Sequence, residues 1–310
     1  MQQFAMQIRI IKEGFSNKKQ KVVKMARKLK RTKRPARNSR SGRRSKHHYL
    51  WWALGFIGAL TLLNAGSYLW FIGGIDWPAK VEEPPAEWAE DFRPEIGDPP
   101  YKIVVDAGHG GSDPGATGVI VEREMTAATA EALVQLLEAD PNFIPLGTRD
   151  SYDTTATPTE RVEQANQQKP DLLLSIHGNS STGGSDASGF ECYPVTPGRT
   201  WHRESLYFAK KLAAEMEAEG NPLRGQGGIR YIYYNEEDQK ILAEANNTQV
   251  REETTFTILE EAECPAVLAE QCFVTNPEDV DQFGDADGVQ RAARVYYQAI
   301  CAYFETEPLE

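Results

Sequence analysis

The 310-residue sequence has few cysteines, and no two of them have a Cys-x-x-Cys spacing. This pattern gives no indication of a structural zinc knuckle, and the spacing alone leaves open whether any cysteines are bridged. The four cysteines are Cys192, Cys264, Cys272 and Cys301. Internal repeats are also absent, which excludes a solenoid built from repeated units.

Acidic residues are nearly missing from the first 47 positions, where Glu13 is the only one. The same stretch holds 17 of the 34 lysines and arginines, so it carries a charge of +16. The net charge of the whole chain is −11, which leaves −27 for the other 263 residues. Residues 1–48 are typical of a disordered basic tail. The acidic remainder would repel phosphates, so we expect no nucleic-acid binding.

Formal charge is absent from Tyr49 to Ile75, a run of 27 largely apolar residues. About 20 such residues suffice to cross a bilayer as a helix. Trp51 and Trp52 near one end and Trp70 near the other suit the two membrane interfaces. A buried soluble helix and a cleaved signal peptide are alternatives, but a signal peptide has an apolar region of only about 7–15 residues. We therefore predict an uncleaved transmembrane anchor at 49–75, with the basic tail inside.

After a Pro-rich, acidic linker at 76–100, short apolar runs alternate with helical patterns. This alternation predicts an α/β domain over 101–306, with a mostly parallel sheet covered by helices on both faces. The expected strands are Lys102–Val105, Phe143–Leu146, Asp171–Ile176, Gly189–Tyr193 and Ala266–Ala269. The expected helices are Glu122–Ala139, Pro158–Gln168, Thr200–Glu219, Arg251–Ala262 and Gly288–Phe304.

Two histidines follow predicted strands. His109 lies in a glycine-rich turn after Ile103–Val105, and His177 ends the run that begins at Asp171. Parallel strands place such residues at one crevice, where ligands bind in open α/β sheets. With one carboxylate they would form the ligand set of many hydrolytic zinc centres. Glu122 and Glu124 begin the next helix and could supply it, although acids in a first helical turn also complement the helix dipole.

Glu270 ends the apolar run that begins at Cys264. A charged group at the end of a buried strand is either paired structurally or functional. Beside a metal-activated water, a glutamate would serve as the general base that takes the proton as the water attacks a carbonyl.

Several motifs in a fixed order resemble those of the zinc-dependent N-acetylmuramoyl-L-alanine amidases of bacterial cell walls. They are IVVDAGHGGSDPGATG, VERE, TRD, RVEQAN, LLLSIHGNSS and CPAVLAEQCFVTNPEDV. The resemblance implies a six-stranded α/β fold that cleaves the amide between the muramic-acid lactyl group and L-alanine. It also implies one Zn²⁺ held by His109, Glu122 and His177, with Glu270 as the catalytic glutamate. Glu124 takes the position of a family aspartate.

Other residues have possible supporting roles. Arg149 and Arg161 resemble family positions near the site, and interior salt bridges are the alternative for both. Asn179 either hydrogen-bonds the bound carbonyl or caps its turn. Asp106 either orients His109 through the second ring nitrogen or fixes the turn. The tyrosines at 231, 233 and 234 favour strand packing over a platform for sugars.

Residues 231–250 form a polar, acid-rich insertion relative to the family pattern. Some amidases of this kind carry an inserted helix that occludes the zinc until a partner displaces it. We therefore weigh gating by 235–247, through Glu236 or Glu237, against a solvated loop or surface helix. A regulatory protein acting on 235–250 would be the corresponding partner.

These features predict a membrane-anchored zinc amidase that acts on peptidoglycan. Residues 49–75 would lie in the cytoplasmic membrane of a bacterium, with the N-terminus inside and the catalytic domain on the periplasmic or cell-wall side. A zinc peptidase that cuts within the stem peptide is one alternative. The other is a non-catalytic anchor that binds peptidoglycan.

Overall fold

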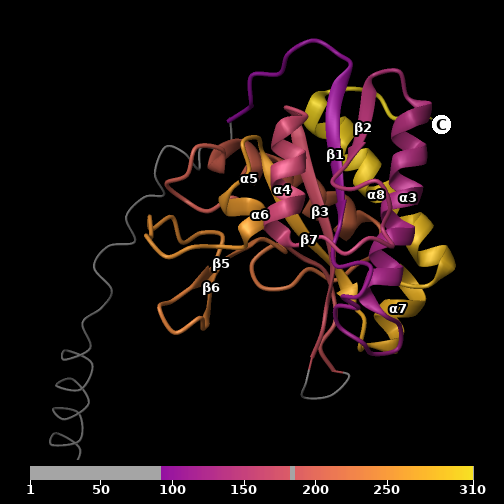
Figure 1. Ribbon diagram of the computed structural model, residues 1–310, viewed down its shortest axis with the longest axis vertical. Helices are drawn as coiled ribbons and strands as arrows, with labels where there is room; N and C mark the ends of the chain where they lie inside the picture. Colours follow the sequence, from indigo (N-terminus) through magenta and orange to yellow (C-terminus); the bar gives the residue numbers. More distant parts are fainter. Residues whose placement is uncertain (1–91, 182–185, 310) are drawn as a thin grey trace, which may run out of the picture. The chain divides into compact units, whose positions relative to one another are not determined.

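A computed structural model describes residues 92–181 and 186–309 (Figure 1). The predicted basic tail (1–48), the transmembrane anchor (49–75) and most of the linker (76–100) lie outside these residues. Within the described part, no helix combines the length and the apolar character needed to cross a membrane. The four cysteines are buried free thiols.

The main sheet has five strands in the order β2-β1-β3-β7-β4. Four of them run parallel, and β4 is an antiparallel edge strand beside β7. The bounds are β1 Tyr101–Ala107, β2 Phe143–Gly147, β3 Leu172–Asn179, β4 Glu191–Pro194 and β7 Ala266–Phe273. The predicted mostly parallel sheet is thus confirmed, but the expected sixth strand is not part of it.

Two further strands form a separate antiparallel hairpin, β5 (Arg230–Tyr234) and β6 (Lys240–Glu244). This hairpin falls in the insertion at 231–250. The insertion is therefore neither a helix nor a simple loop, the two forms considered from sequence. Tyr231 and Tyr233 are buried in it, which confirms the strand-packing interpretation for these two tyrosines, whereas Tyr234 is half-buried.

Helices cover both faces of the main sheet (Figure 1). One face packs against α3 (Glu122–Ala139), α5 (His202–Ala218) and α8 (Ala286–Phe304), and this forms the larger core. The opposite face packs against α4 (Pro158–Gln167) and α6 (Thr257–Glu260) in a smaller core. A further helix is α7 (Pro277–Phe283). Asn276 caps its N-terminus, because its side chain accepts hydrogen bonds from the first-turn amides.

The helix expected at 251–262 is wrong in extent, because only the four residues of α6 are helical. The preceding backbone is engaged elsewhere. Arg199 donates hydrogen bonds to the carbonyls of Arg251 and Glu253, and the carbonyl of Thr254 accepts from the amide of Tyr234 at 2.8 Å. These tertiary bonds hold the segment extended against the hairpin, where a weak helical propensity is overridden.

The strand order reverses beside β1, because the chain leaves β1 for β2 on one side and later returns to β3 on the other. Ligands of open α/β sheets bind at such a switch point, beyond the carboxyl ends of the strands. On the face covered by α4, side chains change from apolar to polar toward these ends. Val104, Leu173 and Leu268 lie in the core, and Asp106, Ser175 and Glu270 follow two residues later on the same face.

Candidate metal centre and catalytic cleft

His109 occupies a tight turn directly after β1. Its φ angle is 62°, in the left-handed region that few residues other than glycine adopt. The neighbouring Gly108 lies against the imidazole of His177, so a Cβ at position 108 would overlap that ring. The two rings approach edge to face, with centroids 5.0 Å apart. The strained turn and the missing Cβ therefore let two histidines from β1 and β3 share one site.

Glu122 lies in the first turn of α3, and its side chain contacts both histidines. Its Oε1 lies 3.0 Å from Nε2 of His109 and 3.1 Å from Nδ1 of His177. The backbone amides of Ala116 and Gly178 also donate to this carboxylate, at 2.8 and 3.0 Å. Glu124, the alternative ligand, is exposed. The structure therefore brings together His109, Glu122 and His177 and leaves Glu124 outside.

The charged groups in this cluster shift one another's pKa values. Burial alone would raise the pKa of Glu122, but hydrogen bonds and charge from His109 and His177 hold it well below its usual range. Burial would lower the pKa of His109, yet Glu122 and Asp113 outweigh it and raise that pKa to about 9. The second ring nitrogen of His109, Nδ1, lies 2.8 Å from Oδ2 of Asp113.

The donor set fits a zinc ion. Two imidazole nitrogens and one carboxylate oxygen lie within 4.8 Å of one another. Tetrahedral zinc with bonds near 2.0–2.1 Å separates its ligand atoms by roughly 3.3 Å, and three protein ligands leave a fourth position free. The hydrogen bond that Asp113 accepts from His109 also fits, because metal-bound histidines are commonly oriented by a carboxylate on the other nitrogen.

Glu270 lies beside this cluster. It pairs in register with His177 on the neighbouring strand, so both side chains project from the same face of the sheet. Oε2 of Glu270 has no hydrogen-bond partner within the described residues. Burial, followed by repulsion from Glu122 and Glu191, raises the pKa of Glu270 to about 8. Such a carboxylate is suited to accept and return a proton near neutral pH.

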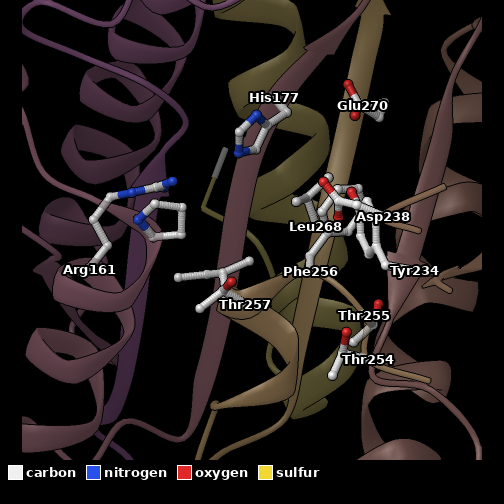
Figure 2. A pocket seen from close by; sticks show the side chains of 12 residues that line it. Arg161, His177, Tyr234, Asp238, Thr254, Thr255, Phe256, Thr257, Leu268 and Glu270 are labelled. Atoms are coloured by element: carbon white, nitrogen blue, oxygen red, sulfur yellow. The ribbon is translucent and has the colours of Figure 1, made fainter. Parts of the chain in front are cut away.

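His177 and Glu270 open into a cleft of about 380 Å³ on the face of the sheet that carries α4 (Figure 2). Arg161 from α4 lies on one side, and Tyr234 and Asp238 from the hairpin lie on the other. Leu268 and Phe256 supply apolar surface between them. The site is therefore a groove with the carboxylate of Glu270 and the imidazole of His177 at one end.

A buried charge network that no sequence pattern indicates lies next to Glu270. Glu191 on β4 is paired with Arg230 at 2.6 Å and with Arg224 at 3.3 Å. The side-chain amide of Asn179 donates to the same carboxylate at 2.5 Å. Asn179 thus has a structural partner in addition to bonding the amide of Ser180 at the end of its turn.

The proposal that Asp106 orients His109 is wrong, because Asp113 takes that position. Asp106 is fully buried and accepts hydrogen bonds from Thr148 at 2.6 Å and Ser175 at 2.7 Å. It also forms an ion pair with Arg161, which confirms the interior salt bridge considered for that arginine. Asp113 could have been found as the carboxylate four residues after the histidine.

Arg149 has a structural role at the same turn. Its guanidinium donates to the carbonyl of Ala107 at 2.5 Å, at the end of β1. It also lies 5.6 Å from the ring centroid of Tyr152. Arg149 therefore supports the strand end from which the His109 turn departs.

Within the insertion, Glu236 and Glu237 do not lie on the histidine cluster. They line a second cavity, which they share with residues 249–254. The residues of the hairpin that line the catalytic cleft are Tyr234 and Asp238.

Comparisons with known proteins agree with this geometry. Residues 103–302 match the family described as N-acetylmuramoyl-L-alanine amidase. The amidase CwlM of Bacillus licheniformis is 28% identical over 208 residues, which cover 66% of this chain and 68% of that protein. The uncharacterized protein YqiI of Bacillus subtilis is 29% identical, over 66% of this chain and 84% of its own length.

Among solved structures, the catalytic domain of the amidase CwlV from Bacillus (Paenibacillus) polymyxa var. colistinus matches with a TM-score of 0.53 and 28% identity. The match covers 67% of this chain and 99% of that domain. The family match spans more than half of the chain and contains all four residues of the His109–Glu122–His177–Glu270 group. The chain therefore belongs to the N-acetylmuramoyl-L-alanine amidase family.

Proposed function

We propose that this protein is a zinc-dependent N-acetylmuramoyl-L-alanine amidase that hydrolyses the amide between the muramic-acid lactyl group and L-alanine in peptidoglycan. The observation that carries the proposal is the convergence of four side chains at one sheet edge. His109, Glu122 and His177 offer a metal-ligand set, and Glu270 is the register neighbour of His177. The amidase activity of the relatives supports the choice of substrate.

His109, Glu122 and His177 would hold the zinc, and Asp113 would keep Nε2 of His109 directed toward it. When bound, the ion supplies a Lewis acid for the scissile carbonyl and lowers the pKa of water toward ~7. Glu122 needs no proton transfer in this scheme, since its carboxylate is already ionised by the two histidines.

Glu270 moves the protons. Its unpartnered Oε2 accepts a proton from the attacking water, which strengthens the water as a nucleophile. The same carboxyl group then returns the proton to the nitrogen of the leaving amine, so that L-alanine departs as an amine. The apolar surface of Leu268 and Phe256 beside it limits the access of competing water.

We also propose that residues 49–75 anchor the chain in the bacterial cytoplasmic membrane and place this domain on the outer side. Support comes from the uncharged apolar run and the basic residues before it. The described chain enters the domain beside the start of β1, where Phe92 packs on Tyr207 at a centroid distance of 6.3 Å. The cleft lies at the opposite, carboxyl ends of the strands, beside His177 and Glu270.

Control by a regulatory protein that acts on 235–250 is a further part of the proposal. Leu242 and Val250 in this segment expose 48% and 65% of their surface. Deleting residues 235–250 should then remove the effect of the regulator, so that the amidase activity in cells that contain the regulator changes. Unchanged activity of the deletion in cells that contain the regulator would contradict this control.

Product analysis tests the proposed reaction. Zinc-loaded protein is incubated with purified sacculi, and the soluble products are examined by mass spectrometry. An amidase releases stem peptides that begin with L-alanine and leaves glycan strands without peptide. A peptidase acting within the stem would leave L-alanine on muramic acid, and a non-catalytic anchor would release nothing. Either of these results would overturn the proposal.

A further inference from the structure

The hairpin formed by β5 and β6 is one wall of the catalytic cleft. Tyr234 and Asp238 line the cleft on the side away from Arg161 (Figure 2). The hairpin contacts the main sheet through Arg230, which bonds Glu191 on the edge strand β4. Because β4 lies next to β7, this wall stands on the Glu270 side of the cleft.

Several contacts fix the wall in place. Arg230 is held between Glu191 at 2.6 Å and Glu244 of β6 at 3.1 Å. The ring of Tyr234 meets Phe256 edge to face, with a centroid distance of 5.9 Å. The hairpin therefore presents its cleft-facing residues from a preorganised position, which favours specific recognition.

The turn that carries Asp238 is pinned by Asn235. Oδ1 of Asn235 accepts hydrogen bonds from the amides of Glu237 and Gln239 at 3.1 and 2.8 Å. The amide of Asp238 donates to the carbonyl of Asn235 at 2.9 Å. Asp238 itself has a φ of 58°, so its backbone is held in the left-handed region. These bonds keep the carboxylate at the rim of the cleft.

The charges that line the cleft leave Asp238 available. Arg161 is neutralised by Asp106, and His177 is bonded to Glu122. Within residues 92–181 and 186–309, the Asp238 carboxylate takes part in no hydrogen bond or ion pair. Glu270 is committed to proton transfer. Among the residues that line the cleft, Asp238 therefore offers a free negative charge to a substrate, and this charge favours a cation. Lys240 of the same hairpin does not line the cleft, and its Nζ lies 5.8 Å from the ring centroid of Phe256.

We infer that Asp238 is a specificity-determining residue, which binds a side-chain ammonium group on the stem peptide of the substrate. The inference rests on the proposed function. Glu270 returns its proton to the leaving amine, so the peptide half of the substrate lies on the Glu270 side, along the hairpin. Tyr234 and Phe256 would pack against the alkyl part of the same side chain.

The test compares two muropeptides that differ only at the side-chain amine of one lysine. One is a disaccharide tetrapeptide with L-lysine at its third position, and the other is the same compound acetylated at Nε. Zinc-loaded full-length wild type should show a kcat/KM about fivefold higher for the free ammonium, the size expected of a partly exposed ion pair. Asp238→Asn should reduce this ratio to about one. Asparagine tolerates the left-handed backbone, so the turn is preserved.

Glu237→Gln is the matched control, because it removes the same charge one residue away, on the side of the second cavity. It should keep the wild-type ratio. Equal ratios for wild type and Asp238→Asn would overturn the inference while the proposed function stood. Loss of the ratio in Glu237→Gln as well would also overturn it, since the preference would then reflect the charge of the whole turn. Failure of the wild type to hydrolyse either muropeptide would overturn the proposed function and the inference together.

Discussion

Glu191 and Glu270 stand directly opposite each other on the antiparallel pair of β4 and β7, yet their surroundings differ. Glu191 is buried and paired with two arginines. Glu270 keeps an oxygen without a hydrogen-bond partner in the described part of the chain, and Glu191 is one of the charges that raise its pKa. A carboxylate fixed by two arginines thus lies opposite the carboxylate that we propose transfers protons.

Replacing Glu191 by glutamine should change the pH dependence of hydrolysis. Loss of the negative charge stabilises the ionised form of Glu270, so its pKa falls and the acidic limb of kcat/KM against pH moves to lower pH. The free energy of unfolding should drop by about 3 kcal/mol, because Arg230 and Arg224 lose a buried partner. The pH–rate profile and urea denaturation measure the two effects.

The control for this variant is Glu253→Gln, which breaks a more exposed ion pair with Arg251. It should change the free energy of unfolding by no more than about 0.5 kcal/mol and leave the pH profile in place. An acidic limb that stays fixed in Glu191→Gln would show that Glu191 does not act on Glu270.

Asp113→Asn and Asp106→Asn should have opposite signatures. Asp113 holds the second nitrogen of His109, so its replacement should weaken zinc binding about 10-fold to 100-fold with little loss of stability. Asp106 is the buried partner of Arg161, so its replacement should cost about 3 kcal/mol of unfolding free energy. Chelator competition and chemical denaturation separate the two. Equal zinc affinities for Asp113→Asn and wild type would contradict the assigned role.

Zinc affinity should rise with pH. Without metal, the pKa of His109 is raised to about 9, so near neutral pH the imidazole carries a proton that zinc must displace. One displaced proton makes the apparent affinity increase about tenfold per pH unit from about pH 7 to 9, and then level off. Competition titrations from pH 6 to 10 measure the slope. An affinity that is constant between pH 7 and 9 would show that His109 is already neutral.

The principal strands, with His109, His177 and Glu270 near their ends, were predictable because their signals are local, whereas the choice of Glu122 over Glu124 came from the family resemblance. Apolar runs marked β1, β3 and β7, and the polar residue ending each run was the one that mattered: His109, His177 and Glu270. Parallel strands bring such ends together, so sequence order sufficed to place them at one edge. The helix at Glu122–Ala139 was predicted with its observed bounds.

The features that could not be predicted from the sequence depend on contacts between distant positions. Arg230 lies 39 residues from Glu191, and no local pattern links them. The hairpin has no alternation of polar and apolar residues in β5, because Tyr231, Ile232 and Tyr233 are all buried. The ring of Tyr231 lies 5.6 Å from that of His202 in α5, and the guanidinium of Arg251 lies 5.3 Å from the ring centroid of Tyr233. The two roles considered for Asp106 could not be separated from sequence, because its position beside the histidine turn does not reveal that its side chain points into the sheet face below α4.

The most direct test measures zinc content and turnover together for wild type, His177→Ala and Glu270→Gln. We predict one zinc per chain and hydrolysis of sacculi for the wild type. His177→Ala should lose both the metal and the activity, whereas Glu270→Gln should keep the metal and lose turnover. Loss of zinc from Glu270→Gln, or a full zinc content in His177→Ala, would contradict the assigned ligand set and the separate role of Glu270.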